Sequence, residues 1–136
     1  MENQVTSIEQ SKRLIELGVP AEKASMVWHH MLRDKKTGYT EWALKIGPIQ
    51  KFPRLEVFPL IPAFTVADLL ELLPSVIFIA IRFNPTLEKT GEDGWDFEFG
   101  QISQDEEYGF AHNKSLIDLL VGRIEWVVSN GYGLNL

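Results

Sequence analysis

The sequence predicts an α+β fold with a mainly antiparallel sheet of four or five strands and about three helices packed mostly on one face. Three observations lead to this prediction. Ser75–Ile81 is an unbroken apolar run rich in β-branched residues, which is typical of a strand buried on both faces. Segments 7–17 and 114–130 carry apolar residues at helical spacing. Segments 26–33 and 40–46 alternate in polarity, as strands do.

The first helix is predicted over residues 7–17, from its periodicity and from a capping box that can be drawn in two ways. Thr6 and Glu9 have the required spacing, and Ser7 with Gln10 is an alternative register. A glycine and then a proline follow the segment, which is typical of a helix end.

An antiparallel hairpin is predicted next. Residues 26–33 and 40–46 flank Asp34–Gly38, whose composition is typical of a turn. His29 and His30 are neighbours on the first strand, so their side chains point to opposite faces and cannot bind one metal ion together.

Residues 47–64 contain four prolines, which exclude a helix or a central strand. The segment is nevertheless apolar, so we expect an extended stretch over the domain with a short edge strand near Arg54–Phe58. Phe52, Phe58 and Phe64 have two interpretations. They are either a strip that binds a partner or the lid of the core, and the lid is the favoured one because a monomer seldom exposes so much apolar surface.

A second helix is predicted to begin with a capping pattern at Thr65–Asp68 and to end at Pro74. The central strand is predicted at Val76–Phe83 and a half-buried strand at Trp95–Phe99. Polar loops are predicted at residues 88–94 and 104–107.

The last helix is predicted over residues 114–130 and is expected to be the most buried, because its apolar stripe is wide. Leu116, Leu119 and Trp126 extend the stripe sideways. A homodimer through these three residues would bury apolar surface that a monomer leaves exposed, so it is one predicted partner interaction.

The whole chain, residues 1–136, is predicted to be one domain. The order helix, strand, strand recurs in residues 6–46 and 65–100, followed by the helix at 114–130. This recurrence is a weak indication of internal duplication.

Composition limits the classes of function. The net charge of −6, from 19 acidic and 13 basic residues, argues against nucleic-acid binding and against adhesion to an anionic membrane. The N-terminus lacks a signal-peptide pattern, and no apolar run approaches the length of roughly 20 residues that spans a membrane. The chain has no cysteine, which excludes thiolate chemistry and fits a reducing cytoplasm.

No catalytic motif, cofactor or metal site is predicted. A role for His29, His30 or His112 needs a positioned partner that the sequence does not show. Asp96 and Glu98 are expected on the exposed side of one strand. The other loop carboxylates lack the spacing of a calcium loop and are expected to be solvated; they are Glu92, Asp93, Asp105, Glu106 and Glu107.

Pro62–Pro74 and Glu125–Tyr132, together with the first helix and the strand around Trp28, are similar to small uncharacterised bacterial proteins often found with prophages and other mobile elements. The resemblance covers most of the chain and depends on structural residues. It implies a bacterial cytoplasmic setting and supplies no activity and no site residues.

The expected function is therefore that of a non-enzymatic protein-binding accessory or modulator protein of a mobile element. One alternative is an acidic immunity or inhibitor-type protein that covers a basic surface. The other is a small ligand-binding protein or enzyme that uses a histidine, and a pocket that places a histidine beside an aspartate or glutamate would favour it.

Overall fold

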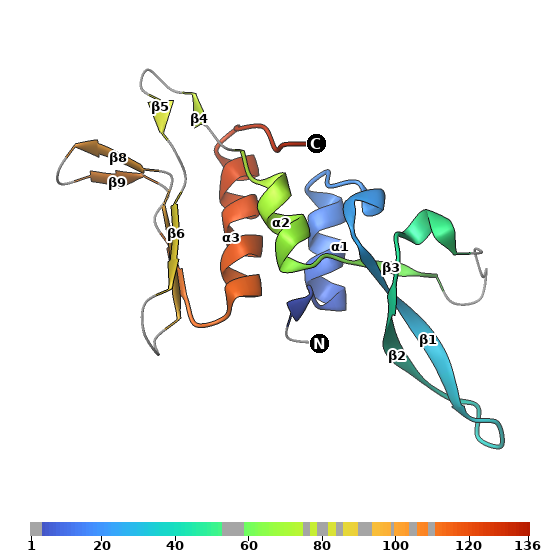
Figure 1. The fold of residues 1–136 in the computed structure, drawn as a ribbon. Helices are drawn as coiled ribbons and strands as arrows, with labels where there is room; N and C mark the ends of the chain where they lie inside the picture. The colour runs from blue at the N-terminus through green and yellow to red at the C-terminus, as the bar shows by residue number, and fades with distance from the viewer. Residues whose placement is uncertain are drawn as a thin grey trace. The chain divides into compact units, whose positions relative to one another are not determined.

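The computed structural model describes residues 4–52, 59–74, 77–78, 82–83, 86–89, 94–98, 100–103, 106–108 and 111–136. Its fold is α+β, as predicted, with three α-helices among these residues (Figure 1). The chain divides into two compact units, Met1–Asp68 and Leu69–Leu136. Among these residues the predicted single sheet of four or five strands is not found, since the strands form two three-stranded and two two-stranded antiparallel sheets.

Helix α1, Ile8–Glu16, confirms the first predicted helix. Its capping box uses the alternative register. The Ser7 hydroxyl accepts a hydrogen bond from the Gln10 N–H over 3.1 Å, and the Gln10 side-chain oxygen accepts from the Ser7 N–H over 3.0 Å. The register that begins at Thr6 is therefore wrong, because Thr6 is fully buried and bonds elsewhere.

The first unit contains the predicted hairpin, β1 (Met26–Asp34) and β2 (Tyr39–Ile46), with β3 (Ile61–Ala63) on the other side of β1. Pro62 lies directly opposite Val27. A proline fits this edge strand because it needs no partner for an N–H. The edge strand predicted at residues 54–58 lies outside the described residues. Two short 3₁₀ turns, η2 (Ala21–Lys23) and η3 (Ile49–Lys51), complete this unit.

Helix α1 contacts β3, and a cluster of buried side chains lies on one face of this sheet. The half-buried side chains of Ile8, Trp42 and Leu44 pack against a buried cluster, whose members are Val5, Met26, Trp28, Ile61 and Ala63. Buried Thr6 connects these elements, since its carbonyl accepts from the Trp28 indole N–H over 2.9 Å.

Helix α2, Val66–Leu72, begins with the predicted capping box. The Thr65 hydroxyl accepts from the Asp68 N–H over 3.2 Å, and the Asp68 carboxylate accepts from the Thr65 N–H over 2.9 Å. The same carboxylate accepts from the backbone N–H of Ser25 at 2.8 Å and from its hydroxyl at 2.5 Å. Asp68 thus fixes the start of β1 to the start of α2.

The apolar run that predicts a central strand is not one strand. Residues Ile77–Phe78 (β4) and Arg82–Phe83 (β5) pair antiparallel with each other, so they are two strands. An apolar run without alternation or turn residues indicates strand structure but does not show where the chain reverses.

Four further strands of the second unit were missed, and two of them overlap the predicted polar loops at residues 88–94 and 104–107. The strands of this part of the unit are β6 (Thr86–Lys89), β7 (Trp95–Glu98), β8 (Gly100–Ser103), β9 (Glu106–Tyr108) and β10 (Ala111–Asn113). Three of them form a sheet in the order β10-β7-β6, and β8 pairs with β9. Only β7 was predicted.

Helix α3, Leu116–Ser129, confirms the last predicted helix and contacts β7 and β10. The Ser115 hydroxyl caps it by accepting from the Asp118 N–H over 3.2 Å. Its buried side chains are Ile117, Leu119, Leu120, Val121, Ile124 and Val127. The side-chain amide of Asn135 donates to the Glu71 carbonyl over 3.0 Å, which fixes the C-terminal residues to the end of α2.

Candidate functional site

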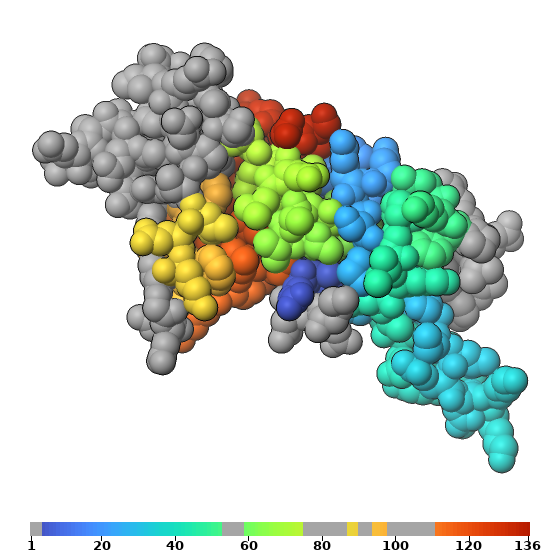
Figure 2. Space-filling model, viewed as in Figure 1, coloured from blue at the N-terminus to red at the C-terminus, as the bar shows by residue number. Residues whose placement is uncertain are grey.

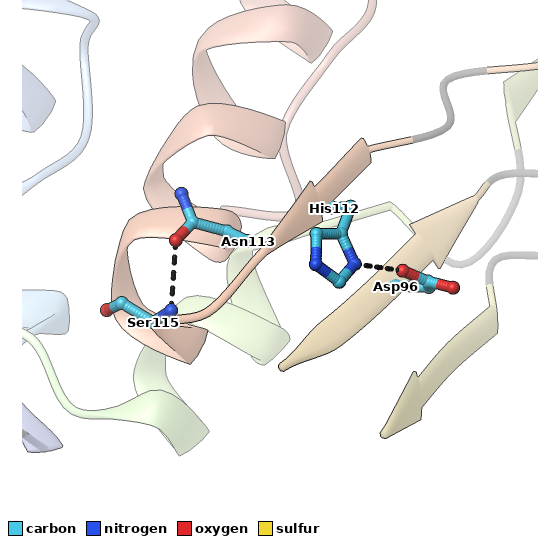
Figure 3. A network of polar contacts seen from close by, with 4 residues as sticks. All are labelled: Asp96, His112, Asn113 and Ser115. Carbon is cyan, nitrogen blue, oxygen red and sulfur yellow. Dashed lines mark hydrogen bonds and ion pairs between the residues drawn. The ribbon is translucent and has the colours of Figure 1, made fainter. Parts of the chain in front are cut away.

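The structure brings together one histidine and one carboxylate that the sequence left apart. His112 on β10 lies directly opposite Asp96 on β7, and the His112 Nδ1 is 2.5 Å from the Asp96 Oδ1 (Figure 3). The two side chains are 41% and 30% exposed. They are therefore accessible from solvent, and they place a histidine beside an aspartate, which is one part of the condition that would favour a histidine-dependent function.

The pair lies on the sheet face opposite the one that holds buried Phe97, because adjacent residues of a strand point to opposite faces. Glu88 on β6 is opposite Asp96 as well, so three titratable residues form a row across the sheet. A carboxylate that accepts from Nδ1 holds the imidazole ring in one orientation and makes Nε2 the basic nitrogen of the neutral ring. Chemically, the pair can act as a weak general base.

The end of β10 leads directly into α3. The Asn113 side-chain oxygen accepts from the Ser115 N–H over 2.9 Å, and the Ser115 hydroxyl caps the helix (Figure 3). Asn113 also approaches Gly94 so closely that any side chain at position 94 would collide with its carbonyl. These contacts set the position of β10 against β7, and with it the spacing of His112 and Asp96.

The other two histidines lie in the first unit on opposite faces of β1, as predicted. His30 is opposite Trp42, its ring centroid is 3.9 Å from that of Trp42, and its Nδ1 is 3.2 Å from the Thr40 hydroxyl. His29 is opposite Ala43. Among the described residues, no group of three or more histidine, aspartate or glutamate side chains is arranged to hold a metal ion. Glu92, Asp93 and Asp105 lie outside the described residues.

The three phenylalanines of the predicted strip do not share one environment. Phe64 is fully buried, so it belongs to the core and cannot contact a partner in the folded chain. Phe52 is half-buried, and its ring lies 4.8 Å from the Lys45 ammonium. Phe58 lies outside the described residues.

The three helix residues predicted for a homodimer also differ in their exposure. Leu119 is only 2% exposed and is part of the core, whereas Leu116 and Trp126 are half-buried. A dimer through Leu116 and Trp126 stays a prediction.

Beside Trp126, partial burial lowers the pKa of the Arg123 guanidinium, because desolvation disfavours its charged form. Arginine nevertheless stays protonated at physiological pH.

The hairpin of the first unit presents a second candidate site, the outer edge of β2. The sheet order is β2-β1-β3, so no described strand pairs with that edge. The outer half of the hairpin extends beyond the other coloured residues of this unit in Figure 2. A surface hollow of about 410 Å³ runs beside β2 and is lined by Met26, Arg33, Glu41, Trp42, Ala43, Leu44 and Ile46.

The direction of the backbone groups of β2 follows from one hydrogen bond. The Gly47 N–H donates to the Ser25 carbonyl at the base of β1 over 2.9 Å. Because peptide groups alternate along a strand, the odd-numbered residues of β2 bond to β1. The even-numbered residues therefore direct their N–H and C=O groups outward, and they are Thr40, Trp42, Leu44 and Ile46.

The surface of β2 combines apolar and charged side chains. Ile46 is 78% exposed, which is unusual for isoleucine, and Trp42 and Leu44 are half-buried. On the opposite face of the hairpin, Glu41 forms an ion pair with Arg33, and Lys45 is exposed. Such an edge is suited to binding another extended chain.

Comparison with known proteins adds no relative, since no family model, no curated protein and no solved structure matches the chain. The resemblance to bacterial mobile-element proteins therefore stays a prediction. In the described part of the chain, none of the helices combines the length and the apolar character needed to cross a bilayer.

Proposed function

We propose that this chain is a non-enzymatic protein-binding module, an accessory or modulator protein of a bacterial mobile element that works in the cytoplasm. The observation that carries the proposal is the outer edge of β2, with its outward backbone groups and the hollow beside it. An edge of this kind binds an extended segment by adding it to the sheet as a further strand.

Two features of the edge support recognition of an extended segment. Main-chain hydrogen bonds supply affinity, and side chains of alternate residues are read on each face. On one face a partner strand would meet Trp42, Leu44 and Ile46, and on the other it would meet Glu41 and Lys45. We expect the bound segment to carry apolar residues at every second position, with charged residues between them.

The acidic inhibitor-type alternative depends on grouped carboxylates. In the first unit, Glu41 pairs with Arg33 and Glu16 pairs with Arg13, so these acidic side chains have a cation beside them. This arrangement favours recognition through the backbone edge over recognition through an acidic surface.

The proposal is tested by selecting peptides from a displayed random library, with Ile46→Pro as the counter-selection. Proline at position 46 removes an outward N–H and fills the space in front of the edge, but it breaks no bond to β1. Enriched peptides should bind the wild type at least about tenfold more tightly than Ile46→Pro, which corresponds to about 1.4 kcal/mol.

The matched control is Ile46→Ala, which removes the same side chain but keeps the N–H, and it should retain most of the peptide binding. Equal binding to the wild type and Ile46→Pro would contradict the proposal, as would a selection that enriches no peptide. Circular dichroism checks that both variants are folded.

A second function is favoured by the His112–Asp96 pair, namely a small enzyme or ligand-binding protein that uses the imidazole as a base. If the pair is catalytic, the chain should cleave an activated ester such as p-nitrophenyl acetate about 10²-fold faster than free imidazole at equal concentration. His112→Gln should abolish this excess, and the control His30→Gln should not. A wild-type rate equal to that of free imidazole would reject this function.

A further inference from the structure

We propose that the outer edge of β2 pairs with the same edge of a second copy of this chain, antiparallel and across a two-fold axis. The inference rests on the proposed protein-binding function and names its partner. The three-stranded sheet of one copy would continue without a break into that of the other. The direction of the backbone N–H and C=O groups of β2, its charges and its apolar side chains all favour this pairing.

The alternating direction of the backbone N–H and C=O groups along β2 permits the pairing. A two-fold axis perpendicular to the sheet and passing beside Ala43 places Trp42 opposite Leu44 of the second copy, and Thr40 opposite Ile46. All four residues direct their N–H and C=O groups outward. In an antiparallel pair such residues exchange both of their hydrogen bonds, so each outward group of Thr40 to Ile46 obtains a partner.

The charges select this register. With the axis beside Ala43, Glu41 lies directly opposite Lys45 of the second copy, and symmetry repeats the pair on the other side. These are non-hydrogen-bonded positions, where opposed side chains approach most closely. Moving the register by two residues in either direction places Glu41 opposite Ala43 or Gly47 and removes both ion pairs. The edge is therefore self-complementary in one register.

The apolar side chains favour the same arrangement. Trp42 of one copy would contact Leu44 of the other on the face that already carries the core of the first unit. Ile46, which is 78% exposed in the single chain, would gain Thr40 of the second copy as a neighbour. Pairing thus continues the apolar face of the sheet across the axis and covers the most exposed of its large apolar side chains.

The experiment uses two charge reversals in the whole chain of residues 1–136. Lys45→Glu places glutamate opposite glutamate in the dimer, and Glu41→Lys places lysine opposite lysine. Like charges at directly opposed positions disfavour pairing. Sedimentation velocity should show a dimer for the wild type and, for each single variant, a dissociation constant raised at least about tenfold, equivalent to about 1.4 kcal/mol.

Mixing the two variants is the decisive measurement. In a mixed dimer, residue 41 of each variant again faces an opposite charge at residue 45 of the other, so association should return to nearly the wild-type strength. The double variant Glu41→Lys/Lys45→Glu should also dimerise. These recoveries separate the effect from misfolding, because the same two substitutions are present in the chains that associate and in those that do not.

Three outcomes would overturn the inference. They are a wild type that stays monomeric up to its solubility limit, a mixture that does not associate, and single variants that dimerise as well as the wild type. The last result would point to another surface, such as α3. Peptide selection at concentrations where the chain is monomeric tests the protein-binding function separately, so failure of self-pairing and failure of that function are distinguishable.

Discussion

Replacing Phe64 with alanine is expected to lower the free energy of unfolding by about 3–5 kcal/mol. Phe64 has no exposed surface, and its backbone bonds to Thr6 in both directions, with its N–H donating over 3.0 Å and its C=O accepting over 2.9 Å. The chain cannot move away from these contacts to close the space left by the ring. The measurement is urea unfolding followed by tryptophan fluorescence.

Phe52→Ala is the matched control, because both residues belong to the predicted strip. Phe52 is half-buried and faces Lys45 and Gly47, so its loss should cost only about 1 kcal/mol. If Phe64→Ala does not fold, Phe64→Leu keeps the comparison measurable, with an expected loss of about 1.5 kcal/mol. Equal losses for Phe52→Ala and Phe64→Ala would show that Phe64 does not have the core role assigned to it.

The helices and the hairpin could be predicted because their signals are local. Caps, periodicity and stop residues lie within each segment, as the Ser7–Gln10 box and the Thr65–Asp68 box show. The turn at Asp34–Gly38 likewise determines its own hairpin. Packing then had only to preserve what the local sequence already favoured.

The rest of the strand pairing could not be predicted, because it depends on partners outside each segment. The run at residues 75–81 has strand composition, yet it gives no sign that Ile77 pairs with Phe83. Strand β10 is only three residues long, Ala111–Asn113, too short for alternation to stand out.

The candidate sites follow the same division. Asp96 was expected on the exposed side of its strand, but its contact with His112 requires β10 to lie beside β7, which no local pattern indicates. Predicting that β2 has an open edge requires knowing which side of β1 pairs with β3. Only when β3 is placed on the far side of β1 is β2 identified as an edge strand. The alternation of β2 and the charges of Glu41 and Lys45 were visible in the sequence. That these residues lie on an edge strand was not.

Thr6→Val is expected to lower the free energy of unfolding by about 2–4 kcal/mol, although it preserves the shape of the side chain. The Thr6 hydroxyl is fully buried, lies 2.7 Å from the Ser11 hydroxyl and accepts from the Phe64 N–H over 3.0 Å. Valine removes this oxygen and leaves two polar groups in the core without it. Each buried group that loses its partner costs about 1–3 kcal/mol.

Ser7→Ala provides the contrast, because the sequence offers Thr6 as the helix cap and Ser7 as the alternative. The Ser7 cap is exposed, so water replaces the lost bond and the expected cost is about 1 kcal/mol. The double variant Thr6→Val/Ser11→Ala should recover part of the loss of Thr6→Val, since it removes one of the two unsatisfied groups. Urea unfolding of the four proteins gives these differences. A loss for Ser7→Ala that equals or exceeds that of Thr6→Val would mean that the helix cap, and not the buried hydroxyl, holds α1 to the sheet.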